Sequence, residues 1–183
     1  PIKHLIKISS TCHTITSESI DYDKANNKVG STCCGIGPTF SKKCLRTNQR
    51  ICDVVEGSYV YGCEIIDFNK FMMEDNKFNR VLFEGSQGYM LDLDLGDYPY
   101  VTSSNCTVGQ ALCNGIPAQY VKQVFGAAKI YDTYVGSKEL SISDEDEETL
   151  ERLGKHGKEV GVTTGRKRSC NWLNSDEVIE ASN

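Results

Sequence analysis

The feature that most constrains the fold is the alternation of short apolar runs, Gly-bounded turns and helical segments along the chain. "RVLFEGSQG" predicts a buried strand, Val81 to Phe83, that stops at a Gly-bounded turn. "PAQYVKQVFGAAKIYDTYVG" predicts an amphipathic helix that starts at Pro117, followed by a strand from about Ile130 to Val135. Strands that alternate with helices favour an α/β fold whose sheet is at least partly parallel.

Two further helices are expected near the C-terminal end. In "SDEDEETLERLGKHG", Ser143 is the expected N-cap, acidic residues fill the first turn, and Gly157 lies near the end. The acidic run 144–148 could suggest a metal site, but the helix macrodipole favours acids there without an ion. A second, shorter helix is predicted from Ser175 to Ala181.

Composition narrows the class of protein. The 183 residues hold only four prolines, with no repeat and no low-complexity tract, so we expect a single domain over residues 1–183. The net charge of −5 argues against a nucleic-acid partner, which would need a basic face. No apolar run approaches the ~20 residues that cross a bilayer, so we expect no membrane partner.

The spacing and the number of the nine cysteines indicate neither a metal site nor a disulfide framework. No C-x-x-C pair occurs, and the three histidines do not stand at zinc-ligand spacing around the cysteines. The count is odd and no secretory signal precedes it, so we expect reduced, mostly buried thiols and a cytoplasmic location.

Three loops carry many hydrogen-bonding groups. In "GSTCCGIGP" (30–38) glycines would let backbone N–H groups approach an anion, although an irregular turn explains them equally simply. In "FEGSQG" (83–88) Gln87 could offer an amide to a phosphate or a base, or lie in a surface turn. In "GDYPYVTSSN" (96–105) four consecutive polar side chains suit either a phosphate or sugar or a capped helix start.

The fourth loop, "GVTTGRKRSCNW" (161–172), is cationic. In extended backbone Arg166 and Arg168 would project to one side, and Lys167 to the other. Two guanidinium forks on one side could bind two anionic groups of one small ligand, whereas a solvated basic turn is the alternative. No Ser-His-Asp or Cys-His set has motif spacing. The residues alone therefore predict an α/β domain that binds a small polyanionic ligand.

Three stretches in this order resemble adenylosuccinate synthetase: "GSTCCGIGP", "VLFEGSQGYMLDLDLGDYPYVTSSN" and "GVTTGRKRSCNWLN". The resemblance implies the central part of a mostly parallel sheet flanked by helices. It also implies a ligase that joins L-aspartate to C6 of IMP through a 6-phosphoryl intermediate. Its co-substrate would be GTP (or ATP), with Mg²⁺ assisting. A homodimer and a cytoplasmic location would follow.

The resemblance assigns roles to individual residues. The purine nucleotide would be bound by Thr32, Arg46, Gln87, Thr102, Val135, Gly136 and Arg166, with Arg46 reaching the neighbouring subunit's site and Val135 and Gly136 lining the ribose. Aspartate would be bound by Thr163, Thr164, Arg166 and Arg168.

Departures from the family pattern limit these expectations. The family's "GDEGKGK"-like loop with its catalytic aspartate, the histidine after it, and its "KLD"-like base-recognition motif have no match in these residues. We therefore expect a partial enzyme with no catalytic residue or metal ligand in this chain, and no turnover by the chain alone. Cys34 replaces an arginine and "YVGSKELS" replaces "RVGxGPFPTE". A viral-type enzyme that converts (d)GMP to 2-aminoadenylosuccinate, in the host cytoplasm, is the alternative, and a non-catalytic nucleotide-binding remnant is another.

Overall fold

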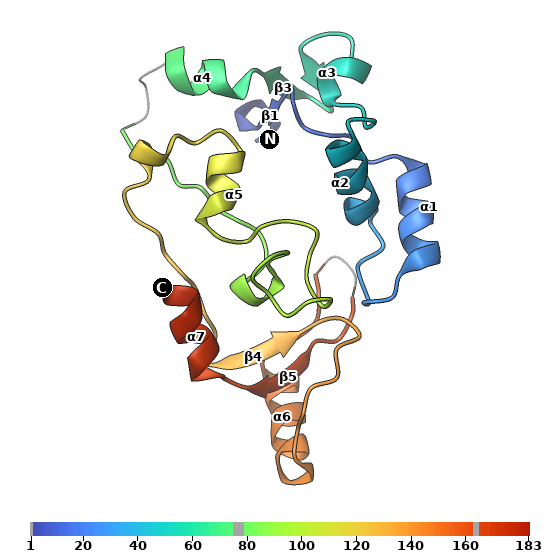
Figure 1. Cartoon of the computed structure of the whole chain (residues 1–183), viewed down its shortest axis with the longest axis vertical. Coiled ribbons are helices and arrows are strands. Elements are labelled where there is room, and N and C mark those ends of the chain that lie inside the picture. The colour runs from blue at the N-terminus through green and yellow to red at the C-terminus, as the bar shows by residue number, and fades with distance from the viewer. Residues whose placement is uncertain (1, 75–78, 163–164) are drawn as a thin grey trace. The chain divides into compact units, whose positions relative to one another are not determined.

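The computed structural model describes residues 2–74, 79–162 and 165–183, and the chain divides into two compact units. The first unit contains Pro1–Ala25, Cys33–Ser86 and Thr107–Val121. The second contains Asn26–Thr32, Gln87–Cys106 and Lys122–Asn183 (Figure 1). The prediction that residues 1–183 form one domain stays a prediction.

The first unit is built on a small mixed sheet. Strand β1 (Lys7–Ser9) runs parallel to β3 (Cys63–Ile66), with Ile8 opposite Ile65. Strand β2 (Tyr59–Val60) pairs antiparallel with β3 on its other edge. The unit also contains short helices: η1 (Lys3–Leu5), α1 (Ser17–Asn26), α2 (Ile36–Leu45), α3 (Ile51–Val54), α4 (Phe68–Glu74), α5 (Val108–Cys113) and η3 (Ala118–Tyr120).

The start of α2 depends on a glycine. Gly35 is buried and has φ +78°, which an L side chain rarely adopts. A Cβ at this position would lie 3.0 Å from the side chain of Ile15 and 3.1 Å from that of Ile20. The glycine-rich loop at 30–38 therefore ends as the left-handed entry into a helix.

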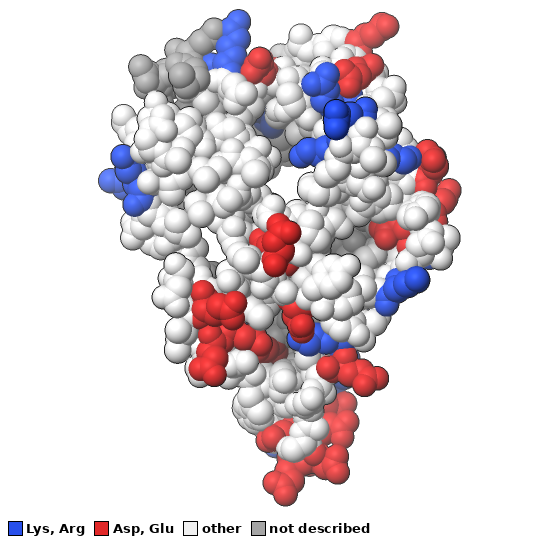
Figure 2. Space-filling view, in the orientation of Figure 1, with Lys and Arg blue, Asp and Glu red and all other residues white. Residues whose placement is uncertain are grey.

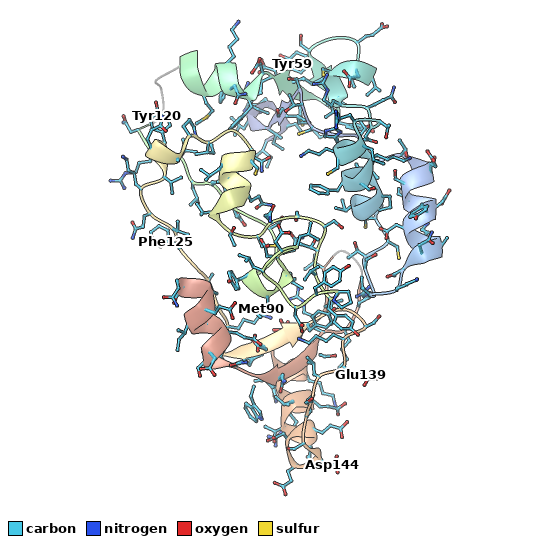
Figure 3. All side chains as sticks on the ribbon, in the orientation of Figure 1. Tyr59, Met90, Tyr120, Phe125, Glu139 and Asp144 are labelled. Carbon is cyan, nitrogen blue, oxygen red and sulfur yellow. The ribbon has the colours of Figure 1, made fainter. Side chains whose placement is uncertain are left out.

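The second unit is a two-stranded ribbon with helices attached. Strand β4 (Tyr131–Tyr134) pairs antiparallel with β5 (Ser169–Trp172). Helix α6 (Asp144–His156) packs on β5, and η2 (Tyr89–Leu91) and α7 (Ser175–Ser182) complete the unit. Asp144 begins α6 at the end far from the ribbon (Figure 3).

The packing of α6 is tight at two positions. Leu150 is only 3% exposed, and a Cβ on Gly154 would lie 3.1 Å from Sγ of Cys170. Four acidic residues occupy the first turn and Lys155 and His156 the last, as the helix macrodipole favours. Figure 2 shows the acids gathered at the start of this helix.

A buried carboxylate organises the loop that follows η2. Asp92 has no exposed surface, and its Oδ1 accepts hydrogen bonds from the backbone N–H groups of Asp94 and Leu95, at 2.9 and 3.1 Å. Its Oδ2 accepts from the backbone N–H of Cys106 at 2.5 Å. Burial raises the pKa of Asp92, but these hydrogen bonds outweigh it and hold the pKa below the ordinary value. The loop 92–106 is therefore folded around one ionised side chain.

Three predicted elements are confirmed. The strand expected at 130–135 is β4, the helix expected after Ser143 is α6, and the helix expected from Ser175 is α7. Ser143 stands at the N-cap position of α6, but its side chain makes no capping hydrogen bond, and its hydroxyl donates to the Asp146 carboxylate instead. The α/β fold class is also confirmed, although β1–β3 is the only parallel pair among the described strands.

Two predicted elements are wrong. Residues 81–83 form no strand, and Leu82 is 83% exposed, because no strand in the described chain pairs with them. After Pro117 only a 3-10 turn forms, at Ala118–Tyr120, and an extended segment runs on to β4. Branched valines and a glycine at 126 weaken helix formation there, and Tyr120 and Phe125 lie exposed on this stretch (Figure 3).

All nine cysteines are thiols outside any disulfide, as predicted, but the expectation that most of them are buried is wrong. Cys63 and Cys170 are buried, whereas five of the nine cysteines are exposed. Small units with few buried residues leave little interior for thiols to occupy. Within the described residues, every helix is too short or too polar to cross a membrane.

Replacing Leu150 with alanine should destabilise the second unit by about 2–4 kcal/mol, because a nearly buried leucine is lost between α6 and β5. Chemical denaturation followed by circular dichroism would measure the change. Val162→Ala is the control, since Val162 is 99% exposed and its truncation should cost little. Equal losses for the two variants would contradict the packing described above.

Candidate functional site

In the second unit, the predicted binding loop that contains Gly30 lies against the predicted binding residues that follow β4. The backbone N–H of Ser137 donates to the carbonyl of Val29 at 3.2 Å. A Cβ on Gly30 would lie 2.7 Å from Oγ of Ser137 and 2.9 Å from the backbone of Gly136. Gly30 also has φ +73°. The close approach of the two backbones therefore requires glycine at position 30.

A third loop joins them through Arg166. Its guanidinium donates from Nη1 to the backbone carbonyl of Ser31 at 2.8 Å, across 135 residues of sequence. The side chain is half-buried. The segments at 29–32, 135–137 and 166 thus form one cluster, and the sequence had predicted a ligand contact in each of them.

The turn at 96–100 is tied to the same cluster. Nζ of Lys138 lies 2.5 Å from the Asp97 carboxylate, and this hydrogen bond raises the pKa of Lys138. Burial raises the pKa of the Tyr134 phenol, and the charge of Arg166 is close enough to act on it in the opposite direction. Lys138 and Asp97 bring the loop 96–105 beside the residues that follow β4.

Thr102 lies within the loop 92–106, and Gln87 lies just before η2. The backbone N–H of Thr102 donates to the carbonyl of Leu91 at 2.8 Å, and Thr102 is half-buried. Gln87 is exposed and has φ +65°, a backbone conformation that is uncommon outside glycine. No helix begins within 102–105; α5 begins at Val108, with Thr107 as its cap. The alternative of a capped helix start at 102 is therefore wrong.

Arg168 is held by an internal carboxylate. Its Nη1 lies 3.3 Å from Oε2 of Glu159, whose side chain is 7% exposed. The other carboxylate oxygen, Oε1, accepts from Nζ of Lys129 and from the hydroxyl of Tyr131, both at 2.7 Å. Hydrogen bonds from Lys129 and then Tyr131 hold the pKa of Glu159 below its ordinary value. The Glu159 carboxylate is therefore ionised at neutral pH. Glu159, Lys129, Tyr131 and Arg168 are called the Glu159 cluster below.

The predicted alternation of the basic loop is borne out in part. Arg166 and Arg168 are half-buried, whereas Lys167 is exposed and lies 3.6 Å from the Glu151 carboxylate. A solvated basic turn does not describe Arg166 and Arg168, because both make hydrogen bonds within the unit. Thr163 and Thr164 lie outside the described residues.

The remaining predicted residues are distributed as follows. Thr32 is exposed at the end of its segment, Val135 is half-buried and Gly136 is exposed. Arg46 belongs to the first unit, where it ends α2 with φ +62°. It lines a cavity of about 440 Å³ together with His13, Lys43, Asn48, Arg50 and Asp53. Figure 2 shows basic side chains gathered over α2 and α3.

Comparisons with known proteins show the family of this chain. A sequence model of adenylosuccinate synthetase matches residues 63–182. The adenylosuccinate synthetase of Brugia malayi is 37% identical over 82% of this chain and 44% of its own length. That of Caenorhabditis elegans is 36% identical over 92% of this chain and 47% of its own length.

This chain belongs to the adenylosuccinate synthetase family. It spans about half the length of the curated relatives it matches. A solved structure, the fully ligated adenylosuccinate synthetase from Plasmodium falciparum, matches with a TM-score of 0.75 and 28% identity, over 90% of this chain and 49% of that chain.

The fold is shared more widely. The succinoaminodeoxyadenylate synthetase (PurZ) of cyanophage S-2L, solved with dGMP and dATP as an energy donor, matches with a TM-score of 0.71 over 96% of this chain and 54% of that chain. Its sequence identity is 20%, so this match concerns the fold alone.

Sequence reasoning missed two features of this adenylosuccinate synthetase-like cluster. Glu159 was not singled out, because a single acid in "KEVGV" has the composition of any loop and two of its three partners, Lys129 and Tyr131, are 30 and 28 residues away. The pair of Asp97 and Lys138 was missed for the same reason. Both depend on tertiary contacts between segments that pattern analysis treats separately.

Gly30→Ala should destabilise the second unit, because its Cβ would enter the space of Ser137 and Gly136 in addition to straining the backbone. Gly57→Ala is a matched control, since Gly57 also has positive φ (+104°) but has nothing within 4 Å. It should cost only about 1–2 kcal/mol for the backbone conformation. Thermal unfolding measures both, and an equal cost would show that the two loops do not approach as described.

Acid should destabilise the second unit through Asp92 and Glu159. Both have lowered folded-state pKa values, so their stabilisation is full above the ordinary values of 3.8 and 4.5 and is lost as the pH falls below them. Unfolding free energy measured from pH 7 to pH 3 should therefore hold until about pH 4.5 and then fall. Asp92→Asn should flatten this fall, while Glu151→Gln, an exposed control, should keep it.

Proposed function

We propose that this chain carries the nucleotide- and aspartate-binding part of an enzyme that joins L-aspartate to C6 of a 6-oxopurine nucleotide, with IMP as the acceptor. The observation that carries the proposal is the convergence of segments 29–32, 96–102, 135–138 and 166 in one unit. Family membership supports the proposal, because the resemblance assigns contacts with the purine nucleotide to residues in these segments.

The proposed reaction is a C–N ligation driven by a nucleoside triphosphate. The terminal phosphoryl group of GTP, or of ATP, passes to O6 of the purine. The aspartate amino nitrogen then forms a bond to C6, the C6–O bond breaks, inorganic phosphate leaves and the nitrogen gives up a proton. The product is adenylosuccinate.

The nucleotide is proposed to bind through neutral donors around the loop cluster. Thr32, Gln87 and Thr102 offer two hydroxyls and an amide to the phosphate, and Gly136 with Val135 lines the ribose. Hydroxyl and amide side chains suit this task because they donate hydrogen bonds to phosphate oxygens. Arg166 is proposed to lie beside the nucleotide sugar, with its Nη1 bond to Ser31 fixing one end of the guanidinium.

Aspartate is proposed to bind to Arg168, with Thr163 and Thr164 as neighbours in sequence. A guanidinium matches a carboxylate in a bidentate, charge-assisted pair. Arg168 is one-third exposed, so the side of the group turned away from Glu159 can receive a ligand. The two arginines, separated by one residue, are thus proposed to bind different ligands: Arg166 the nucleotide and Arg168 the aspartate carboxylate.

The proposed contribution of this chain to the reaction is to bind and orient the purine nucleotide and aspartate. No catalytic residue is proposed within these 183 residues. The described part of the chain offers no group of three or more His, Cys, Asp or Glu side chains placed for a metal ion. No step is assigned to the Mg²⁺ that the family resemblance implies.

Arg46 is proposed to act in a homodimer in the cytoplasm, by reaching the nucleotide of the neighbouring subunit. Its cavity brings together Lys43, Arg46 and Arg50, and hydrogen bonds from Arg50 hold the pKa of Asp53 at about 2. Such a concentration of positive charge suits a phosphate group.

Calorimetric titration of the full-length natural protein with IMP, GMP and dGMP tests the acceptor. We expect IMP to bind most tightly. A preference for a guanylate would move the proposal to the 2-amino substrate of the viral-type enzyme, a shift that the departures at Cys34 and in "YVGSKELS" could accommodate. Nucleotide binding without any use of aspartate would instead indicate a non-catalytic relative.

Arg168→Ala should weaken aspartate use far more than nucleotide binding, because the lost guanidinium leaves an aspartate carboxylate without its partner. We expect the KM for aspartate to rise at least about 30-fold, on the order of 2 kcal/mol, with nucleotide affinity nearly unchanged. Steady-state kinetics and calorimetry measure the two quantities. Lys167→Ala is the control, and equal losses for both substrates would contradict the role of Arg168.

A further inference from the structure

We propose that Glu159 is a positioning residue: its buried carboxylate fixes the Arg168 guanidinium in the orientation that receives the aspartate carboxylate. This inference rests on the proposed function, because it takes aspartate as the ligand of Arg168. It adds a residue that does not touch the ligand and acts through another side chain.

The burial of Glu159 is the first argument. Its side chain is 7% exposed, which is rare for glutamate and requires strong compensation. Three donors supply it: Lys129 and Tyr131 at Oε1, each at 2.7 Å, and Arg168 at Oε2. A carboxylate held at both oxygens cannot rotate without losing one of these bonds, so it is a fixed reference point for Arg168.

The backbone supports the same pair. The N–H of Arg168 donates to the carbonyl of Glu159 at 2.9 Å, and Val160 and Lys167 form an antiparallel bridge next to it. Glu159 and Arg168 are therefore neighbours on two paired segments, with both main chain and side chain joined. The main-chain and side-chain hydrogen bonds together hold the Arg168 guanidinium next to the Glu159 carboxylate.

Lys129 and Tyr131 hold the carboxylate from the other side. Lys129 also donates to Oγ1 of Thr133 at 3.0 Å and lies 5.4 Å from the centre of the Tyr131 ring. Both residues therefore have contacts of their own along β4 and the segment before it. The position of Glu159 is thus tied to β4, the strand that Val135 and Gly136 follow.

The charges of the cluster point to an anionic ligand. Lys129 and Arg168 carry two positive charges, and Glu159 carries one negative charge, so one positive charge is in excess. A guanidinium has five N–H donors, and in the described residues its hydrogen bond to Glu159 is made from Nη1. The Arg168 side chain is 34% exposed, whereas Glu159 is not, so a carboxylate can approach the arginine and not its partner.

Glu159→Gln in the full-length natural protein tests the inference, because it keeps the shape of the side chain and removes the charge. We expect the KM for aspartate to rise about tenfold, as the loss of one charge-assisted hydrogen bond predicts. The KM for the nucleotide and the kcat at saturating aspartate should each change less than about twofold. Tyr131→Phe, a milder variant that removes one bond to Oε1, should raise the KM for aspartate about threefold.

Glu151→Gln is the matched control. Glu151 is a carboxylate that pairs with the same loop, at Lys167, but its side chain is 53% exposed. Its replacement should leave both KM values unchanged. A general loss of folding in the Glu159 variant would lower activity with both substrates alike, and that outcome would overturn the inference. An unchanged KM for aspartate in both the Glu159 and the Tyr131 variants would also overturn it.

A measurement without turnover separates this inference from the proposed function. The side-chain Nε–H NMR signal of Arg168, assigned by its loss in Arg168→Ala, should broaden in Glu159→Gln and stay sharp in Glu151→Gln. An unchanged signal in Glu159→Gln would overturn the positioning role. A wild-type protein that uses no aspartate with IMP, GMP or dGMP would instead refute the proposed function, while the NMR result would still report on Arg168.

Discussion

The ionised carboxylate of Glu159 is the interaction on which the second unit depends most. A buried charge is costly unless it is hydrogen-bonded and paired, and here two cations and a phenol satisfy it. These partners come from the segment before β4, from β4 itself and from the loop before β5. The Glu159 side chain therefore connects β4, the segment before it and the residue before β5, in addition to the backbone hydrogen bonds between the two strands. Asp92 does the same for the loop 92–106 through backbone donors.

Close backbone approach is the second constraint, and it places the loops. Gly30 allows the segment 29–31 to lie against Gly136 and Ser137, and Arg166 then reaches Ser31 from a distant part of the sequence. Polar groups on three loops are brought together without a large apolar core, since few hydrophobic side chains are buried. The binding geometry thus rests on hydrogen bonds and ion pairs, which are directional, more than on packing, which is not.

Sequence patterns correctly predicted the helices and strands that are specified by neighbouring residues in the chain. Helix α6 follows from the serine at its N-cap position, its acidic first turn and its C-terminal glycine, and all three signals lie within the helix or next to it, although the Ser143 side chain makes no capping hydrogen bond. The apolar run at 81–83 and the segment after Pro117 failed because a strand needs a partner and a long helix needs a covered face. Neither is present in the described chain, and sequence pattern contains no information about it.

For the site, the amino-acid sequence by itself determined which residues have the right chemistry: the glycines and hydroxyls of three loops, and two arginines separated by one residue. It also determined the family, because motif order and spacing survive in the chain. Only the tertiary structure decided how those arginines are used. Arg166 bonds to a backbone carbonyl and Arg168 to a buried carboxylate, because partners up to 135 residues away are brought within hydrogen-bonding distance by folding alone.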